Sequence, residues 1–237
     1  MNGYLVNAVN LTKTFGSVTA LNNFSISLPK GRIIGLLGPN GSGKTTFIKT
    51  LAGLLVPTSG SVTIDGEAPG VYTKSIVSYL PERTYFSSWM KVSDCLDYFS
   101  DFYSDFDRTV AENMLHTLSV PLDRKLQTLS KGTKEKVQLV LVMSRRAKLY
   151  ILDEPIGGVD PAARDFILDT IISNYNPESS VIISTHLISD VERVLGSFIF
   201  IHNGRLVMSG ECDDVREQYG KSLDEVFREV FKCLPNS

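Results

Sequence analysis

The sequence predicts an α/β domain with a mostly parallel sheet at its core, an antiparallel β part near the N-terminus and an inserted helical part. Three patterns support this prediction: short apolar runs that alternate with helical patterns, strand patterns separated by turn residues, and a long stretch of helical patterns with no strand. We expect one domain over 1–237, with the antiparallel part in about 1–30 and 60–80, the helical part in about 84–147, the rest of the core in about 148–210, and a tail over 211–237.

Composition narrows the class of protein. Of 237 residues, 43% are hydrophobic and 21% are charged, which excludes disordered and collagen-like chains. The 24 basic and 26 acidic side chains form no dense basic cluster, so we expect no nucleic-acid partner. Three widely spaced cysteines fit a reducing compartment. Apolar runs are shorter than the roughly 18 to 20 residues that cross a bilayer, and no signal peptide is recognised, so we expect a cytoplasmic chain.

The first third of the chain supplies the antiparallel part and the start of the core. Over 4–28, apolar and polar residues alternate between turn-forming residues, as in antiparallel strands. An apolar strand over 32–37 is followed by glycines and by helical periodicity over 46–55. Further strands are expected over 61–64 and 75–80.

The middle of the chain, over 90–147, has helical patterns only. Its first helix carries aromatic residues at 98, 99, 102, 103 and 106, interleaved with Asp97, Asp101 and Asp105. Packing into the core is the simpler interpretation. The alternative is that this part, with Trp89 and Met90 before it, forms a groove for a helix of a membrane partner. Beyond it we expect strands over 149–152, 181–184, 198–202 and 205–208, and helices over 161–173 and 188–195.

A phosphate-binding motif lies between the strand at 32–37 and the following helix. Its glycines let backbone N–H groups turn towards phosphates, its lysine reaches the β- and γ-phosphates, and its last threonine ligates Mg²⁺. A surface turn before a helix is the alternative, but the strand and helix around the motif favour phosphate binding. The residues are Gly38, Pro39, Asn40, Gly41, Ser42, Gly43, Lys44 and Thr45, and we expect Thr46 to bind the nucleotide as well.

Two adjacent carboxylates end a later strand. Asp153 and Glu154 follow the apolar run Leu149–Leu152, where an aspartate would hold Mg²⁺ beside the phosphates. Glu154 would accept a proton from a water that attacks the γ-phosphate. Capping of the strand end is the alternative, yet two buried carboxylates are costly without a cation.

Further motifs resemble those of the ATP-binding cassette (ABC) ATPases, in the order of that family and over about residues 4–210. Leu129–Thr133 resembles the signature motif, Glu82 stands at the Q-loop position, and Gly158–Pro161 resembles the D-loop. Phe15 matches the aromatic residue that stacks on adenine, and His186 matches the switch histidine.

Taken singly, several of these motifs have structural alternatives. Asp160 before a proline and Ser130 before a helix are both good N-cap residues. His186 alone would fit a hydrogen bond at a strand end, and Phe15 alone would fit a core position. The conjunction of motifs favours the resemblance.

The resemblance implies a P-loop NTPase fold with a RecA-like core that uses ATP and Mg²⁺. Thr45, Asp153 and Glu82 would surround the metal, whereas Lys44, Glu154, His186 and Glu82 would take part in catalysis. It also implies a head-to-tail dimer, in which Ser130 and Gly132 of one chain contact the nucleotide on the other and Asp160 connects the two sites. The second cassette would be this chain again or a relative.

Two departures place the sequence within the family. Glu82 replaces the usual glutamine, and Lys131 and Thr133 replace a glycine and a glutamine of the signature. Both departures, and the ending at 221–227, resemble the branch that serves drug, bacteriocin, ion and polysaccharide exporters.

We therefore expect the ATP-binding and ATP-hydrolysing subunit of an ABC transporter. Separate transmembrane permease subunits would carry the substrate outward, and this chain would lie on the cytoplasmic face of the cell membrane. The alternative is a soluble ABC-type ATPase that acts on DNA or ribosomes, but the long coiled coil or second cassette of those proteins is missing from this sequence. A small-molecule kinase would use Lys44 but leave Ser130, Glu154 and His186 without a role.

Overall fold

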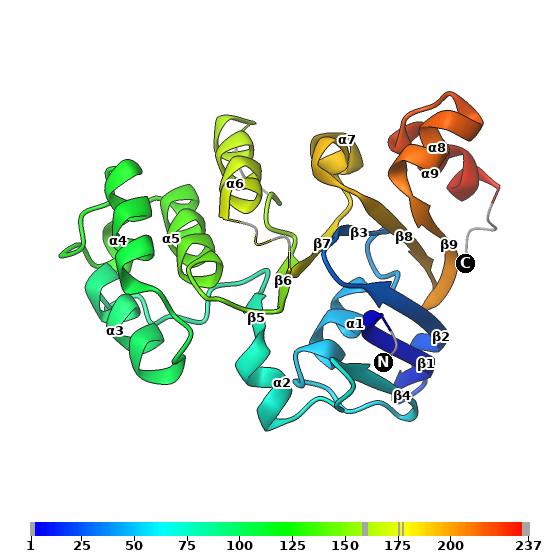
Figure 1. Ribbon diagram of the computed structural model, residues 1–237, viewed down its shortest axis with the longest axis horizontal. Helices are drawn as coiled ribbons and strands as arrows, with labels where there is room; N and C mark the ends of the chain where they lie inside the picture. The colour runs from blue at the N-terminus through cyan, green and yellow to red at the C-terminus, as the bar shows by residue number, and fades with distance from the viewer. Residues whose placement is uncertain (1–2, 158–160, 175, 177, 234–237) are drawn as a thin grey trace.

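The protein, described by a computed structural model over residues 3–157, 161–174, 176 and 178–233, has the predicted α/β architecture (Figure 1). Within these residues one sheet has the strand order β5-β6-β7-β3-β8-β9, and its neighbours are parallel except β8 and β9. A second, antiparallel sheet has the order β2-β1-β4. The strands are β1 (Tyr4–Phe15), β2 (Val18–Pro29), β3 (Ile33–Leu37), β4 (Ser59–Ile64), β5 (Val77–Leu80), β6 (Leu149–Asp153), β7 (Ser180–Thr185), β8 (Ser197–His202) and β9 (Arg205–Glu211).

The helices cover both faces of the large sheet, and three of them form the inserted helical part beside the edge strand β5 (Figure 1). They are α1 (Lys44–Leu51), α2 (Val71–Ile76), α3 (Val92–Phe102), α4 (Arg108–Thr117), α5 (Lys131–Met143), α6 (Pro161–Asn174), α7 (Ile188–Val191), α8 (Cys212–Tyr219) and α9 (Leu223–Lys232), with short 3₁₀ turns η1 (Leu126–Thr128) and η2 (Glu192–Val194).

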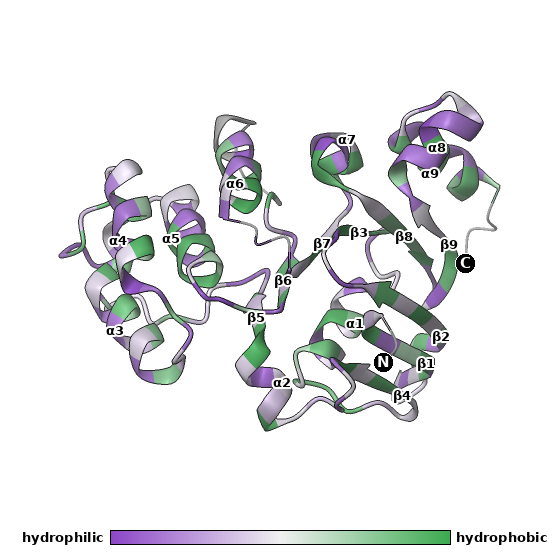
Figure 2. Cartoon of the chain, viewed as in Figure 1, coloured by the Kyte–Doolittle hydropathy of each residue, from purple (hydrophilic) through white to green (hydrophobic). Residues whose placement is uncertain are grey.

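The core lies on both faces of β3. Leu36 belongs to a cluster that α1 and the antiparallel sheet complete, whereas Leu37 belongs to a second cluster shared with α5 and the tail helices. A strand covered on both faces needs apolar residues at consecutive positions, which explains the continuous run that predicted it. Figure 2 shows this as hydrophobic green along β3 and β8, in contrast to the hydrophilic purple of α8.

Two corrections concern the segment over 60–80. The strand expected over 75–80 begins at Val77, because a short helix, α2, precedes it and is closed at its start by a hydrogen bond from Gly70 N–H to Thr73 Oγ1 (2.8 Å). β5 then pairs in parallel with β6. Within this segment β4 therefore joins the antiparallel sheet and β5 joins the core.

Three other boundaries differ from the prediction. The helix expected over 46–55 begins at Lys44 and ends at Leu51, because Gly53 takes a left-handed conformation (φ +67°) that ends the helix. The helix expected over 188–195 is one α-helical turn continued by the 3₁₀ turn η2. The tail from 211 onward contains the end of β9 and the helices α8 and α9.

The aromatic face predicted in the helical part is only partly correct. α3 ends at Phe102, and Tyr103 already has an extended backbone (φ -125°). The buried ring of Phe99 contacts Tyr103 and Phe106 with centroid distances of 5.1 and 5.4 Å, so the core interpretation is right for Phe99. Tyr98 and Phe102 are exposed, so it is wrong for them.

A buried arginine joins the helical part to the core. Arg145, just beyond α5, donates two hydrogen bonds to the Asp105 carboxylate (2.9 and 3.1 Å) and one each to the carbonyls of Val77 (2.7 Å) and Ser75 (2.8 Å). Its guanidinium also lies 3.9 Å from the ring centroid of Tyr103. The Arg145 side chain is 2% exposed and Asp105 is 22% exposed, so the guanidinium itself is sheltered from water.

Replacement of this arginine should destabilise the fold. Arg145→Met leaves Asp105 and two carbonyls without their donor, so we expect a loss of about 3 kcal/mol in the free energy of unfolding. Arg146→Met is the matched control, because Arg146 is 78% exposed in its pair with Asp107 and should cost less than about 1 kcal/mol. Urea unfolding followed by circular dichroism measures the free energy of unfolding of both variants. Equal losses would contradict the stabilising role of the Arg145 contacts, which we call the clamp.

Candidate functional site

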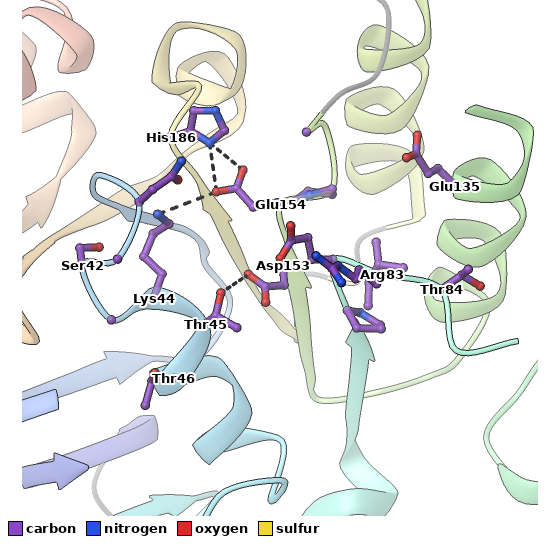
Figure 3. A pocket seen from close by; sticks show the side chains of 18 of the residues that line it. Ser42, Lys44, Thr45, Thr46, Arg83, Thr84, Glu135, Asp153, Glu154 and His186 are labelled. Carbon is purple, nitrogen blue, oxygen red and sulfur yellow. Dashed lines mark hydrogen bonds and ion pairs between the residues drawn. The ribbon is translucent and has the colours of Figure 1, made fainter. Parts of the chain in front are cut away.

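A cleft of about 1000 Å³ opens where β3, β5, β6 and β7 end (Figure 3). Parallel strands that lie side by side bring the loops at their carboxyl ends to one edge of the sheet, which is where ligands bind in open α/β sheets. The cleft is lined by Phe15, Ala20, Asn40, Gly41, Ser42, Gly43, Lys44, Thr45, Thr46, Leu80, Pro81, Glu82, Arg83, Thr84, Lys131, Glu135, Gln138, Asp153, Glu154, Pro155, Gly157 and His186.

The phosphate loop is held against the hairpin between β8 and β9. A Cβ atom at Gly38 would lie 2.3 Å from the Ile201 carbonyl oxygen, so only glycine fits there. Gly43 has φ +109° just before α1, a conformation that side chains rarely adopt. The N–H of Gly204 donates to the Ser42 carbonyl (2.8 Å). The loop therefore needs glycines at these positions because other backbone segments lie close behind it.

Lys44 lies at the first position of α1 with its ammonium in the cleft. Nζ donates to the carbonyls of Gly38 (2.8 Å) and Pro39 (3.2 Å) and lies 3.8 Å from Glu154 Oε1. Burial lowers the pKa of Lys44, and the negative charges of Glu154, Asp153 and Glu82 oppose this effect. A buried ammonium is suited to bind an anionic ligand, and a cation that enters with this ligand would offset the charge of the three carboxylates.

Asp153 ends β6 and points at the start of α1. Its Oδ1 accepts hydrogen bonds from Ser184 Oγ (2.6 Å) and Thr45 Oγ1 (3.4 Å). Oδ2 is buried and has no hydrogen-bond partner among the described residues. Burial raises the pKa of Asp153, while the hydrogen bonds from Ser184 and Thr45 lower it. The unpartnered oxygen is consistent with a hard cation beside Thr45.

The Glu154 carboxylate contacts side chains from two different sides of the cleft. Its backbone is left-handed (φ +50°), and its N–H donates to the Ser184 carbonyl (3.0 Å). This conformation turns the carboxylate away from Asp153, so that His186 Nδ1 lies 3.2 Å from Oε1 and 3.1 Å from Oε2 (Figure 3). Glu154 is 14% exposed and His186 is 45% exposed. The carboxylate therefore bridges Lys44 on α1 and His186 beyond β7.

Most of the residues predicted for the site come together in this cleft. Phe15, half exposed at the end of β1, and Glu82, beyond β5, both line it with the phosphate loop. Gly38 and Pro39 lie outside the lining and contact the Lys44 ammonium through their carbonyls. Asp160 lies outside the described residues.

Ser130 and Gly132 are not part of the cleft lining. Ser130 is the N-cap of α5, with its Oγ accepting from Thr133 N–H (3.2 Å). Gly132 lies in the first turn, and a Cβ atom added there would meet no atom within 4 Å. The N-cap interpretation from the sequence is therefore correct, and the first turn of α5 is open to another molecule.

Sequence reasoning did not select Arg83, Glu135 or Gln138 as site residues. Arg83 follows Glu82 directly and points into the cleft (Figure 3). Glu135 and Gln138 lie one and two turns beyond Lys131 on α5 and line the same cleft. Their spacing along the helix was the available signal, because residues three and four apart share a helical face.

Comparisons with known proteins agree with this geometry. A family model described as ABC transporter matches residues 21–157, more than half of the chain. The chain belongs to the ABC transporter family. It is 31% identical to the ABC-type transporter ATP-binding protein EcsA of Bacillus subtilis, over 96% of this chain and 97% of that protein. It is 30% identical to the SkfA peptide export ATP-binding protein SkfE of the same organism, over 90% of this chain and 92% of that protein.

A solved structure, described as that of an ATP binding subunit of an ABC transporter, has a TM-score of 0.85 and 28% identity, covering 96% of this chain and 99% of that one. The protein is thus the ATP-binding and ATP-hydrolysing subunit of an ABC transporter. The comparisons support this interpretation and not an ATPase that acts on DNA or ribosomes. In the described part of the chain, every helix is too short or too polar to cross a bilayer.

Loss of the cleft ammonium should weaken nucleotide binding. Lys44→Ala removes the buried positive charge that faces three carboxylates, so we expect ATP affinity to fall by about tenfold or more. Lys49→Ala on the exposed face of α1 is the matched control and should bind as wild type does. Titration with a fluorescent ATP analogue compares the two variants. Wild-type affinity in Lys44→Ala would contradict the assignment of Lys44 to phosphate binding.

Proposed function

We propose that this chain hydrolyses ATP with Glu154 as the proton acceptor, in a dimer of cassettes that drives export through separate membrane subunits. The observation that carries the proposal is the position of the Glu154 carboxylate, between the Lys44 ammonium (3.8 Å) and His186 Nδ1 (3.1 Å). A carboxylate beside the phosphate loop and a switch histidine is placed to receive a proton from an attacking water.

The residues around Asp153 fit Mg²⁺. Thr45 and Asp153 present hard oxygen ligands, and Oδ2 of Asp153 is buried without a partner among the described residues. No group of three or more His, Cys, Asp or Glu side chains that could hold a metal occurs in the described part of the chain. Mg²⁺ commonly takes one or two protein ligands and completes its shell with water and phosphates, so a threonine and an aspartate suffice. When bound, it neutralises charge on the phosphates.

In this mechanism each side chain has one task. Lys44 binds the β- and γ-phosphates and Phe15 stacks on the adenine. Glu154 accepts the proton of the attacking water, and His186 holds the γ-phosphate and water in line. Glu82, exposed at the rim beyond β5, adds a carboxylate near the metal side of the cleft.

A second cassette would complete the site. Ser130 and Gly132 lie outside the cleft of their own chain, at an open helix start that offers N–H donors to an anion. We place this helix start against the γ-phosphate of a partner cassette in a head-to-tail dimer. Asp160, next to the D-loop proline, would link the two sites.

The membrane partner would dock beside the helical part. A groove of about 370 Å³ lies between the end of α1, strand β5 and the end of α3, and exposed Leu54, Tyr85 and Phe102 line it. Trp89, before α3, is 65% exposed. Exposed aromatic side chains around a groove are suited to an amphipathic helix, here one from a permease on the cytoplasmic face of the membrane. The relative SkfE is described as a peptide export protein, which supports the outward direction.

Replacement of the proposed proton acceptor separates binding from hydrolysis. Glu154→Gln keeps the shape of the side chain and removes its basicity, so ATP should still bind while turnover falls at least about a hundredfold. The variant should form a dimer with Mg-ATP, seen by size-exclusion chromatography with light scattering. Glu112→Gln on α4 is the control. Wild-type turnover in Glu154→Gln would rule out the proton-acceptor role.

Removal of the exposed tryptophan should uncouple hydrolysis from transport. Trp89→Ala takes contact area from the proposed permease interface and none from the nucleotide cleft. We expect basal ATP hydrolysis to persist while substrate movement by the assembled transporter falls several-fold. Tyr219→Ala, at an exposed aromatic residue of α8, is the matched control. Unchanged transport in Trp89→Ala would show that this side chain is not part of the interface.

A further inference from the structure

The segment that follows His186 is held from two sides. It consists of α7 and η2, residues 188–194, and begins two residues after the histidine. Towards α6, Asp190 accepts from Arg164 Nη1 (2.6 Å) and Arg193 Nη2 donates to Asp165 (2.8 Å). The second of these pairs is largely exposed to solvent, so it restrains the segment weakly.

On the other side, Glu192 binds the first turn of the C-terminal helix α9. Leu223 N–H donates to Oε1 (2.8 Å) and Asp224 N–H donates to Oε2 (3.5 Å). Arg216 of α8 lies 3.9 Å from Oε1 and donates to the Glu192 carbonyl (3.5 Å). The carboxylate is 15% exposed and lies at the positive end of a ten-residue helix, where a negative charge is stabilised.

The helix to which Glu192 binds is itself fixed to the large sheet. Phe227 and Phe231 of α9 pack on Phe200 of β8, with ring centroid distances of 5.2 and 6.0 Å. Phe200 is fully buried and precedes Ile201, whose carbonyl lies directly under Gly38 of the phosphate loop. The tail is therefore packed on the strand that lies behind the phosphate loop, and the sheltered side chain of Glu192 attaches the histidine segment to it.

We infer that Glu192 is a positioning residue for His186, through which the C-terminal helices α8 and α9 hold the histidine at the γ-phosphate. This inference rests on the proposed role of His186 at that phosphate. The sequence offered no role for the tail; the contacts assign it the task of fixing the segment 188–194 relative to the cleft. A tail that is displaced would release His186 without altering any residue of the phosphate loop.

The test compares two nucleotides that differ in the γ-phosphate. Affinities of the purified full-length chain for adenylyl imidodiphosphate and for ADP, both with Mg²⁺, give a preference for the third phosphate that needs no hydrolysis. We expect His186→Ala to lower this preference about fivefold and Glu192→Ala to lower it about threefold. Glu192→Gln keeps an accepting oxygen and should fall between Glu192→Ala and wild type.

The matched control is Asp213→Asn, which removes the exposed ion pair of Asp213 with Arg216 (2.9 Å) and leaves Glu192 on α9. It should behave as wild type does. A loss in His186→Ala together with an unchanged preference in both Glu192 variants would overturn the positioning role and leave the proposed function intact. An unchanged preference in His186→Ala would overturn the role of the histidine and, with it, this inference.

Hydrogen exchange provides a second readout that does not depend on nucleotide binding. In Glu192→Ala, amides over 187–196 and 221–226 should exchange several-fold faster than in wild type, while those over 38–50 keep their protection. Wild-type exchange over 187–196 in this variant would show that the carboxylate does not hold the segment, and would overturn the inference even if the affinities changed.

Discussion

The register of four parallel strands governs the rest of this structure. β5, β6, β7 and β3 pair so that Leu80 lies opposite Leu152, Asp153 opposite Ser184, and Leu37 opposite Thr185. Each strand therefore ends at nearly the same level, and the residues beyond these ends meet in one cleft. A slip of β6 by one residue would turn Asp153 to the other face of the sheet. The geometry of the cleft follows from this alignment.

Within the cleft, the two adjacent carboxylates have different partners. Asp153 still belongs to β6 and accepts from Ser184, while Glu154 adopts φ +50° and reaches His186. Neighbouring acidic residues in an extended strand would also diverge, but this left-handed turn additionally holds Glu154 N–H against the Ser184 carbonyl. The strain of a left-handed non-glycine residue is offset by that hydrogen bond and by the partners of the side chain.

Much of this site was predictable because its residues are local in sequence. The phosphate loop lies between a strand and a helix, and Asp153 and Glu154 end an apolar run, so pattern and chemistry agreed. Glu135 and Gln138 share a helical face with Lys131, but only the packing of the helical part against β5 brings that face to the cleft, and Arg83 belongs to no motif. The strand predicted over 75–80 includes the last two residues of α2, because a short run does not distinguish a helix end from a strand. The exposure of Tyr98 and Phe102 was not predictable, since a helical face does not say which part of it the core covers.

The clamp at Arg145 also has a geometric consequence for α5. The guanidinium fixes the C-terminal end of this helix to the carbonyls that lead into β5, whereas Ser130 stands at the other end, open to solvent. Thirteen residues of α-helix span about 20 Å, so a tilt of about 10° about the fixed end displaces the serine by about 3.5 Å. The pivot is buried and the far end is exposed, so a small rotation inside the protein becomes a displacement longer than a hydrogen bond at its surface.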